Sequence, residues 1–149
     1  MIEAPARVLF VSTGGACRSL FAQALLRKIG GSTFEAWSAG TDPTPIDPLT
    51  LEVLERAGID ASDLTPQPLA DLVGRPFEYV ITLCDDARLV CPVFPGADQS
   101  MHWGYPSPAS QPDCDARRAE MERVFVLLGE RIRQFVLIAG RAQPTAVAG

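Results

Sequence analysis

Short apolar runs alternate along the chain with longer segments in which apolar residues recur every three or four positions. The short runs are typical of strands, whereas the longer period is typical of helices with one buried face. The pattern predicts strands at 8–11, 34–38, 79–83 and 99–103, and helical segments at 19–28, 49–57, 69–73 and 115–138. Because strands and helices alternate, we expect a three-layer α/β/α fold with a four-stranded parallel sheet.

Length and charge limit the number of domains and the kinds of partner that we expect. The 149 residues are the size of one domain, and we expect a single α/β domain over 1–142 and a flexible tail over 143–149. The net charge of −5, without a dense run of Lys or Arg, argues against a nucleic-acid or membrane-surface partner. No stretch reaches the roughly 18 apolar residues of a membrane span, and no secretion signal is present, so we expect a cytoplasmic protein.

The segment after the first predicted strand has the features of an anion-binding loop. Gly14 and Gly15 allow a tight turn and the close approach of a ligand, so that successive backbone N–H groups can converge on one point. The next helix directs its N-terminus at the same point, and Arg18 can pair with two oxygens of one oxyanion. The predicted oxyanion site comprises the whole loop: Ser12, Thr13, Gly14, Gly15, Ala16, Cys17, Arg18 and Ser19.

The spacing of Ser12 and Arg18 is similar to that of the Cys-x5-Arg phosphate loop of low-molecular-weight protein tyrosine phosphatases and thioredoxin-coupled arsenate reductases. Blocks at 34–41 and 77–86 extend the resemblance, which covers about residues 7 to 138. Blocks at 91–96 and 102–108 resemble the arsenate-reductase branch more than the phosphatase branch. The resemblance implies a low-molecular-weight phosphatase-like fold and, as function, the reduction of arsenate to arsenite.

In the resembled family, the position of Ser12 carries the thiol that attacks arsenic or phosphorus. A hydroxyl has a far higher pKa than a thiol and stays protonated unless a general base lies beside it. The only histidine, His102, is far along the chain. We therefore expect Ser12 to cap the loop and the chain as written to be inactive. The position of the family's general-acid aspartate is occupied by Ser107. Natural decay of catalysis and deliberate replacement of the nucleophile both fit these residues.

Cys84 and Cys91 favour the reductase branch. Seven residues span about 10 Å of a helix, whereas a disulfide needs Cα atoms within about 7 Å. If the segment is helical, its oxidation would unwind it. The resemblance implies that Cys84 relays electrons, that Cys91 is the terminal thiol, and that thioredoxin reduces their exposed disulfide. The alternative is that Cys84 and Cys91 are packing thiols without a redox role. We expect Cys17 to be a packing thiol and Cys114 to be incidental to function.

Three functions stay open. The first is an arsenate reductase with a catalytic set of Ser12, Arg18, Cys84 and Cys91. The second is a non-catalytic protein that binds or senses an oxyanion. The third is a low-molecular-weight tyrosine phosphatase, against which both Ser107 and the cysteine pair count.

The expected partners follow from these functions. They are a small oxyanion (arsenate, phosphate or sulfate) and, for the reductase, thioredoxin. No cofactor and no metal is expected. Asp85 and Asp86 are adjacent carboxylates without a histidine or third carboxylate nearby, and we expect them to cap the following turn.

Overall fold

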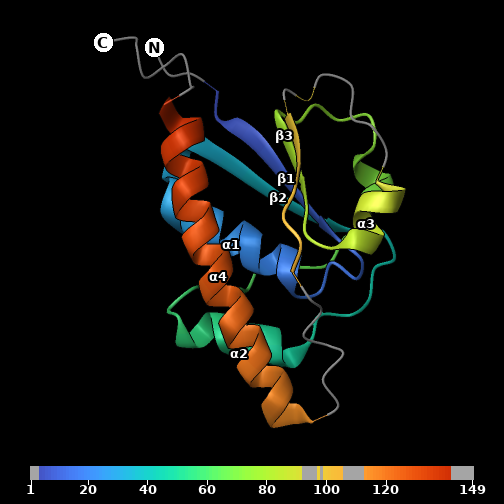
Figure 1. Ribbon diagram of the computed structural model, residues 1–149, viewed down its shortest axis with the longest axis vertical. Coiled ribbons are helices and arrows are strands. Elements are labelled where there is room, and N and C mark those ends of the chain that lie inside the picture. Colours follow the sequence, from blue (N-terminus) through green and yellow to red (C-terminus); the bar gives the residue numbers. More distant parts are fainter. Residues whose placement is uncertain (1–3, 92–96, 98, 106–112, 142–149) are drawn as a thin grey trace.

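The computed structural model describes residues 4–91, 97, 99–105 and 113–141. Its strands form one parallel sheet in the order β2-β1-β3-β4 (Figure 1). The strands are β1 Ala6–Ser12, β2 Phe34–Gly40, β3 Tyr79–Thr82 and β4 Gln99–His102. The helices are α1 Arg18–Gly30, α2 Pro48–Arg56, α3 Asp85–Val90 and α4 Cys114–Arg141, with 3-10 turns at Gly31–Thr33 and Leu69–Leu72. The predicted α/β/α fold is confirmed.

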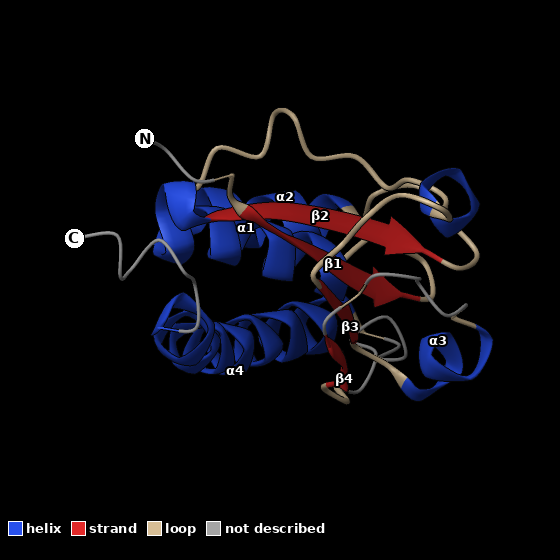
Figure 2. Cartoon of the chain, turned by 90° about the horizontal axis from the view of Figure 1, so that it is seen from above, coloured by secondary structure: helices blue, strands red, loops and turns tan. Residues whose placement is uncertain are grey.

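The sheet separates two layers of helix (Figure 2). α1, α2 and α4 lie on one face, and α3 lies on the other. Successive side chains of β1 serve the two faces in turn, as expected for a strand buried on both sides. Val8 and Phe10 pack with α1 and α4, whereas Leu9 and Val11 pack with α3 and the 69–72 turn. Residue 12 is the next position on the α1 side.

Element boundaries depart from the sequence pattern by a few residues. β1 and β2 extend to Ser12 and Gly40, because hydrogen bonding between them continues through that pair. α4 begins at Cys114, one residue before the predicted helix at 115–138. Ser107 and the predicted tail at 143–149 lie outside the described residues. Within the described ranges, no helix combines the length and the apolar character needed to cross a membrane.

The parallel arrangement gathers four chain positions at one edge of the sheet. The carboxyl ends of the strands are Ser12, Gly40, Thr82 and His102. In open α/β sheets, ligands bind at this edge, because the loops leaving the strands meet there. The loop from β1 to α1 leaves the sheet at the same edge, and the candidate site is built around it.

Candidate functional site

The loop at 12–17 is fixed by the segment that follows β2. Three successive loop carbonyls accept hydrogen bonds from that segment: Thr41 N to Ser12 O at 3.0 Å, Asp42 N to Thr13 O at 2.8 Å, and Thr44 N to Gly14 O at 3.0 Å. These three carbonyl oxygens are therefore occupied by donors of the protein itself. Among the hydrogen bonds of the described residues, the N–H groups of Gly14, Ala16 and Cys17 donate to no protein acceptor. This polarity is that of an anion-binding nest.

Two glycines allow the loop to lie directly against the end of β2. Gly15 has φ +65°, and a Cβ there would lie 2.9 Å from the backbone nitrogen of Gly40. A Cβ on Gly40 would lie 2.7 Å from the carbonyl carbon of Gly14. The approach therefore requires glycine on both sides. Gly14 itself has no positive φ, and its reason for being glycine is space: a Cβ would lie 2.8 Å from Thr44 Oγ1.

Ser12 uses its hydroxyl to brace the loop. The side chain is buried, with 2% exposure. Its Oγ donates to Ser19 Oγ at 2.9 Å and accepts from Gly15 N at 3.2 Å. The histidine considered as a general base for Ser12 lies elsewhere. His102 bonds to Asp85 of α3, whereas Ser12 bonds to Ser19 of α1, so the imidazole ring and the serine hydroxyl lie on opposite faces of the sheet. The geometry is that of the capping role expected for Ser12.

Arg18 enters the site from the first turn of α1 and is 8% exposed. Its Nη1 donates to the carbonyl oxygen of Tyr105 at 2.9 Å. This bond leaves Nε and Nη2, which form the other edge of the guanidinium, available for two oxygens of a ligand. Because the head group is fixed by a partner 87 residues away, its orientation depends on the tertiary fold.

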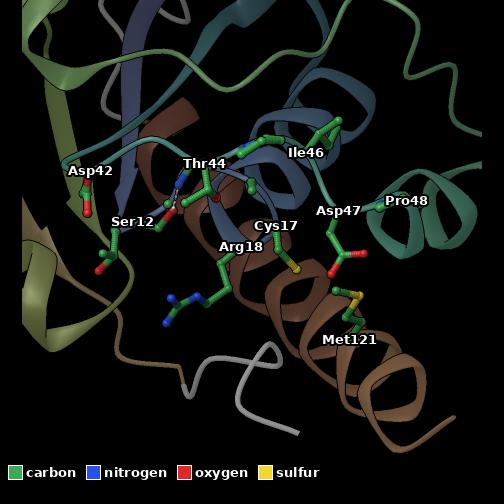
Figure 3. Close-up of a pocket in the computed structure, with 14 residues that line it drawn as sticks. Ser12, Cys17, Arg18, Asp42, Thr44, Ile46, Asp47, Pro48 and Met121 are labelled. Carbon is green, nitrogen blue, oxygen red and sulfur yellow. Dashed lines mark hydrogen bonds between the residues drawn. The ribbon is translucent and has the colours of Figure 1, made fainter. Parts of the chain in front are cut away.

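The loop forms one wall of a pocket of about 490 Å³ (Figure 3). Its other walls are the segment after β2, the start of α2 and one residue of α4, and the residues outside the loop are Asp42, Thr44, Pro45, Ile46, Asp47, Pro48 and Met121. Figure 3 shows Cys17, Asp47 and Met121 directed toward one another on the side of the pocket away from Ser12. An oxyanion of five heavy atoms occupies only part of this volume.

Cys17 is a poor nucleophile in this setting. Burial raises the pKa of its thiol to about 12, and the nearby Asp47 carboxylate acts in the same direction. A hydrogen bond with Thr50 and the charge of Arg18 lower the pKa but do not compensate for burial. The thiol also packs against the main hydrophobic core. Cys17 is therefore a neutral packing thiol, as expected from the sequence, and it also lines the pocket.

The structure brings Cys84 to the loop and leaves Cys91 at the far end of α3. Cys84 Sγ lies 3.2 Å from Thr13 Oγ1, within hydrogen-bond distance. Cys84 is buried, whereas Cys91 is half-buried, and that burial raises the pKa of the Cys91 thiol. The helix between them includes both cysteines in its hydrogen bonds: Arg88 N donates to Cys84 O at 3.1 Å, and Cys91 N donates to Ala87 O at 2.9 Å. The helical geometry considered for this segment is confirmed.

A polar contact between β3, β4 and α3 did not emerge from the sequence. His102 Nδ1 lies 2.8 Å from Thr82 Oγ1, and His102 Nε2 lies 2.8 Å from Asp85 Oδ1. Asp85 therefore binds a histidine, and the expectation that it caps the turn is wrong: α3 has Cys84 at its N-cap and no side-chain cap. The sequence offers only the general rule that the carboxyl ends of parallel strands meet at one edge, and this rule does not identify the pair. In the described part of the chain, no three His, Cys, Asp or Glu side chains gather as metal ligands would.

A family model described as low molecular weight phosphotyrosine protein phosphatase matches residues 7–139. The chain belongs to this family. Arsenate reductase 2 of Staphylococcus saprophyticus is 33% identical over 128 residues, which cover 86% of this chain and 94% of that protein. An arsenate reductase of Halalkalibacterium halodurans is 31% identical over 129 residues, covering 86% of this chain and 93% of that one. The family resemblance expected from the sequence is confirmed.

Solved structures of the family agree with the fold. A thioredoxin-dependent arsenate reductase of Corynebacterium glutamicum has a TM-score of 0.75 and 34% identity. The match covers 95% of this chain and 66% of that one, so this chain spans just under two thirds of that protein. A tyrosine phosphatase of Erwinia amylovora, with a TM-score of 0.71 and 22% identity over 91% of this chain and 93% of its own, shares the fold. This member of the low-molecular-weight phosphatase family is thus arsenate reductase-like.

Proposed function

We propose that the chain binds arsenate in the pocket at residues 12–18 and has the framework of a thioredoxin-coupled arsenate reductase whose covalent step stops at Ser12. The observation that carries the proposal is the contact of Thr13 Oγ1 with Cys84 Sγ at 3.2 Å. This contact places the thiol expected to act as relay against the loop expected to hold the substrate. The arsenate reductases among the relatives support arsenate as the oxyanion.

Binding rests on groups that carry positive charge or partial charge. The free N–H groups of the loop, the N-terminus of α1 and the guanidinium of Arg18 all belong to the same wall of the pocket. Each favours an anion, and the guanidinium adds a planar pair of donors. Burial of Arg18 strengthens this attraction, because the surrounding dielectric is lower than that of water.

A thiol at position 12 would complete a balanced reaction. In Ser12→Cys, the new thiolate attacks arsenic and forms a sulfur–arsenic bond, and one arsenate oxygen leaves as water. The Cys84 thiolate then attacks that sulfur. The electron pair of the breaking bond stays on arsenic, which leaves as arsenite, and a disulfide joins the two sulfurs. The Cys91 thiolate next attacks Cys84 and releases the first thiol. A dithiol of the thioredoxin class finally supplies two electrons and reduces the Cys84–Cys91 disulfide.

The chain as written supports a second candidate, a non-catalytic protein that binds an oxyanion. The observation in its favour is that the Ser12 hydroxyl is already hydrogen-bonded on both sides, to Ser19 and to Gly15. Such a hydroxyl braces the nest and leaves it able to hold phosphate, sulfate or arsenate without chemistry. In that case the cysteine pair is inherited from a reductase ancestor.

The test compares the chain with Ser12→Cys. Both proteins are expected to bind arsenate in calorimetric titration, and only Ser12→Cys is expected to oxidise reduced thioredoxin in an arsenate-dependent manner. The double variant Ser12→Cys with Cys84→Ala is the control and is expected to bind without turnover. If Ser12→Cys binds arsenate without turnover, the result would favour the second candidate. If Ser12→Cys hydrolyses an aryl phosphate but does not reduce arsenate, the result would favour a phosphatase. Failure of both proteins to bind arsenate would contradict the proposal.

A further inference from the structure

The contact between His102 and Asp85 lies directly beside the cysteine pair. Asp85 is the first residue of α3 and follows Cys84, the relay candidate. His102 is the last residue of β4 and pairs in register with Thr82 of β3. The ring is held from the sheet side by Thr82 Oγ1 and holds α3 through Nε2, so it joins the helix to two strands.

Most of the described side chains of α3 are exposed to solvent. Ala87 is fully buried against the smaller core cluster. Asp86 and Arg88 are exposed, and Leu89 is 81% exposed. The described side chains of α3 therefore contribute little apolar packing, and the polar contact at its first residue adds to its attachment.

Closing a disulfide between Cys84 and Cys91 is incompatible with the helix. The helical spacing separates the two Cα atoms by about 10 Å, beyond the 7 Å or so that a disulfide spans. Both cysteines also take part in helical hydrogen bonds, through Cys84 O and Cys91 N. Oxidation must therefore break these bonds and disturb the first turn of α3, where Asp85 meets His102.

We propose that the His102–Asp85 contact is a latch that stabilises the reduced, helical form of α3 and so opposes formation of the Cys84–Cys91 disulfide. This inference rests on the redox role given to the two cysteines in the proposed function. His102 acts as a positioning residue: it sets how readily the disulfide forms and accepts no electron itself. By favouring the dithiol, the latch makes the disulfide more readily reduced by a partner dithiol.

Gly104 leaves space for the contact between His102 and Asp85. A Cβ at position 104 would lie 3.3 Å from His102 Nε2 and 3.9 Å from Asp85 Oδ1. The absence of a side chain there leaves room for the ring and the carboxylate to meet. Gly104→Ala is therefore expected to weaken the latch without removing either partner.

The experiment is a redox equilibration of the full chain with dithiothreitol in its reduced and oxidised forms. In each step, Cys84 and Cys91 lose two protons and two electrons to oxidised dithiothreitol, which becomes the dithiol. Arg88 lies between the cysteines, so tryptic cleavage separates them and a disulfide links two peptides. Cys114→Ser serves as the background, because Cys114 shares a tryptic peptide with Cys91.

Asp85→Ala and His102→Asn are each expected to raise the equilibrium constant for disulfide formation two- to fivefold, the range of a polar pair in which one partner, the Asp85 carboxylate, is 87% exposed. This corresponds to a reduction potential about 9 to 21 mV more negative. The double variant is expected to show no further change. Asp86→Ala is the matched control, since it removes a carboxylate from the same first turn but no contact with His102, and it is expected to leave the constant within the error of the measurement.

The outcomes separate the latch from the underlying function. Equal changes in Asp85→Ala and Asp86→Ala, no change in either latch variant, or a change toward the dithiol would overturn the latch while leaving the redox pair intact. If no Cys84–Cys91 disulfide forms in any variant under fully oxidising conditions, the redox role in the proposed function fails, and the latch fails with it.

Discussion

The loop at 12–19 and the segment at 84–91 lie next to each other, but they are held in opposite ways. Three carbonyls, two glycine contacts and a buried serine pair fix the loop. The segment contains a six-residue helix whose described side chains are mostly exposed, with Ala87 buried and a polar contact from Asp85 to β4. An oxyanion site gains from donors that need no rearrangement, whereas a disulfide exchange needs a segment that can change shape. Under the proposed function, oxyanion binding and disulfide exchange therefore fall to two segments that are held in place to different degrees.

The largest effect is expected from crowding the rigid region. Gly15→Ala places a methyl group against the backbone of Gly40 at a positive φ, and we expect the free energy of unfolding to fall by about 3 kcal/mol. Gly58→Ala is the control, because Gly58 also has a positive φ but open space around it, and a loss of about 1 kcal/mol is expected. Urea denaturation measures both. Equal losses would show that the loop is not packed as described.

The next effect concerns the charge in the pocket. Arg18→Lys keeps the charge but removes the planar fork and the bond to Tyr105 O, so we expect the dissociation constant for arsenate to rise about tenfold, equivalent to about 1.4 kcal/mol. Isothermal titration calorimetry provides the measurement. Arg123→Lys changes an exposed arginine of α4 and should leave the affinity unaltered. A loss of affinity in both variants would indicate a diffuse charge effect.

Hydrogen exchange should reveal the difference in rigidity directly. Leu83 N–H donates to Val11 O directly after the end of β3, and Arg88 N–H donates to Cys84 O in the first turn of α3. We expect the Arg88 amide to exchange at least about a hundredfold faster than the Leu83 amide, because a short, lightly packed helix opens locally. Similar protection of the two amides would mean that α3 is as stable as the sheet.

A smaller effect concerns Cys17. Since its pKa is raised to about 12, roughly one thiol in ten thousand is ionised at pH 8, and alkylation is expected to be slow at that pH. The rate should rise about tenfold for each pH unit up to about pH 12, as the thiolate fraction grows. Mass spectrometry after timed treatment with iodoacetamide follows the reaction. Rapid modification at pH 7 would show that the thiol is not buried as described.

The elements could be predicted because their signals are local. The apolar run at 8–11 and the period of three to four residues in 115–138 depend on neighbours in the sequence, and both fall inside observed elements. The loop could be located for the same reason, since Gly14, Gly15 and Arg18 are consecutive or nearly so. The residues that contact them could not be predicted from local signals. Gly40 opposite Gly15 and Tyr105 beside Arg18 are set by how β2 and the segment after β4 approach the loop.

The contact of His102 with Asp85 shows a further limit. Its formation depends on the register of β4 against β3, which places His102 beside Thr82, and on the helix that begins at Asp85. Neither register nor side-chain direction is encoded in a short stretch of sequence. For this reason, the sequence pattern presents Asp85 and Asp86 as turn caps, whereas Asp85 binds a histidine in the structure.

The most direct test of the account is an NMR titration of the 15N-labelled chain with arsenate, with phosphate and sulfate in parallel. If the loop amides and Arg18 enclose the oxyanion, arsenate will produce saturable shifts that are concentrated at the amides of 14–19 and at the Arg18 side chain. Shifts spread evenly over the surface, or none at these positions at millimolar arsenate, would contradict the claim that this loop is an oxyanion site.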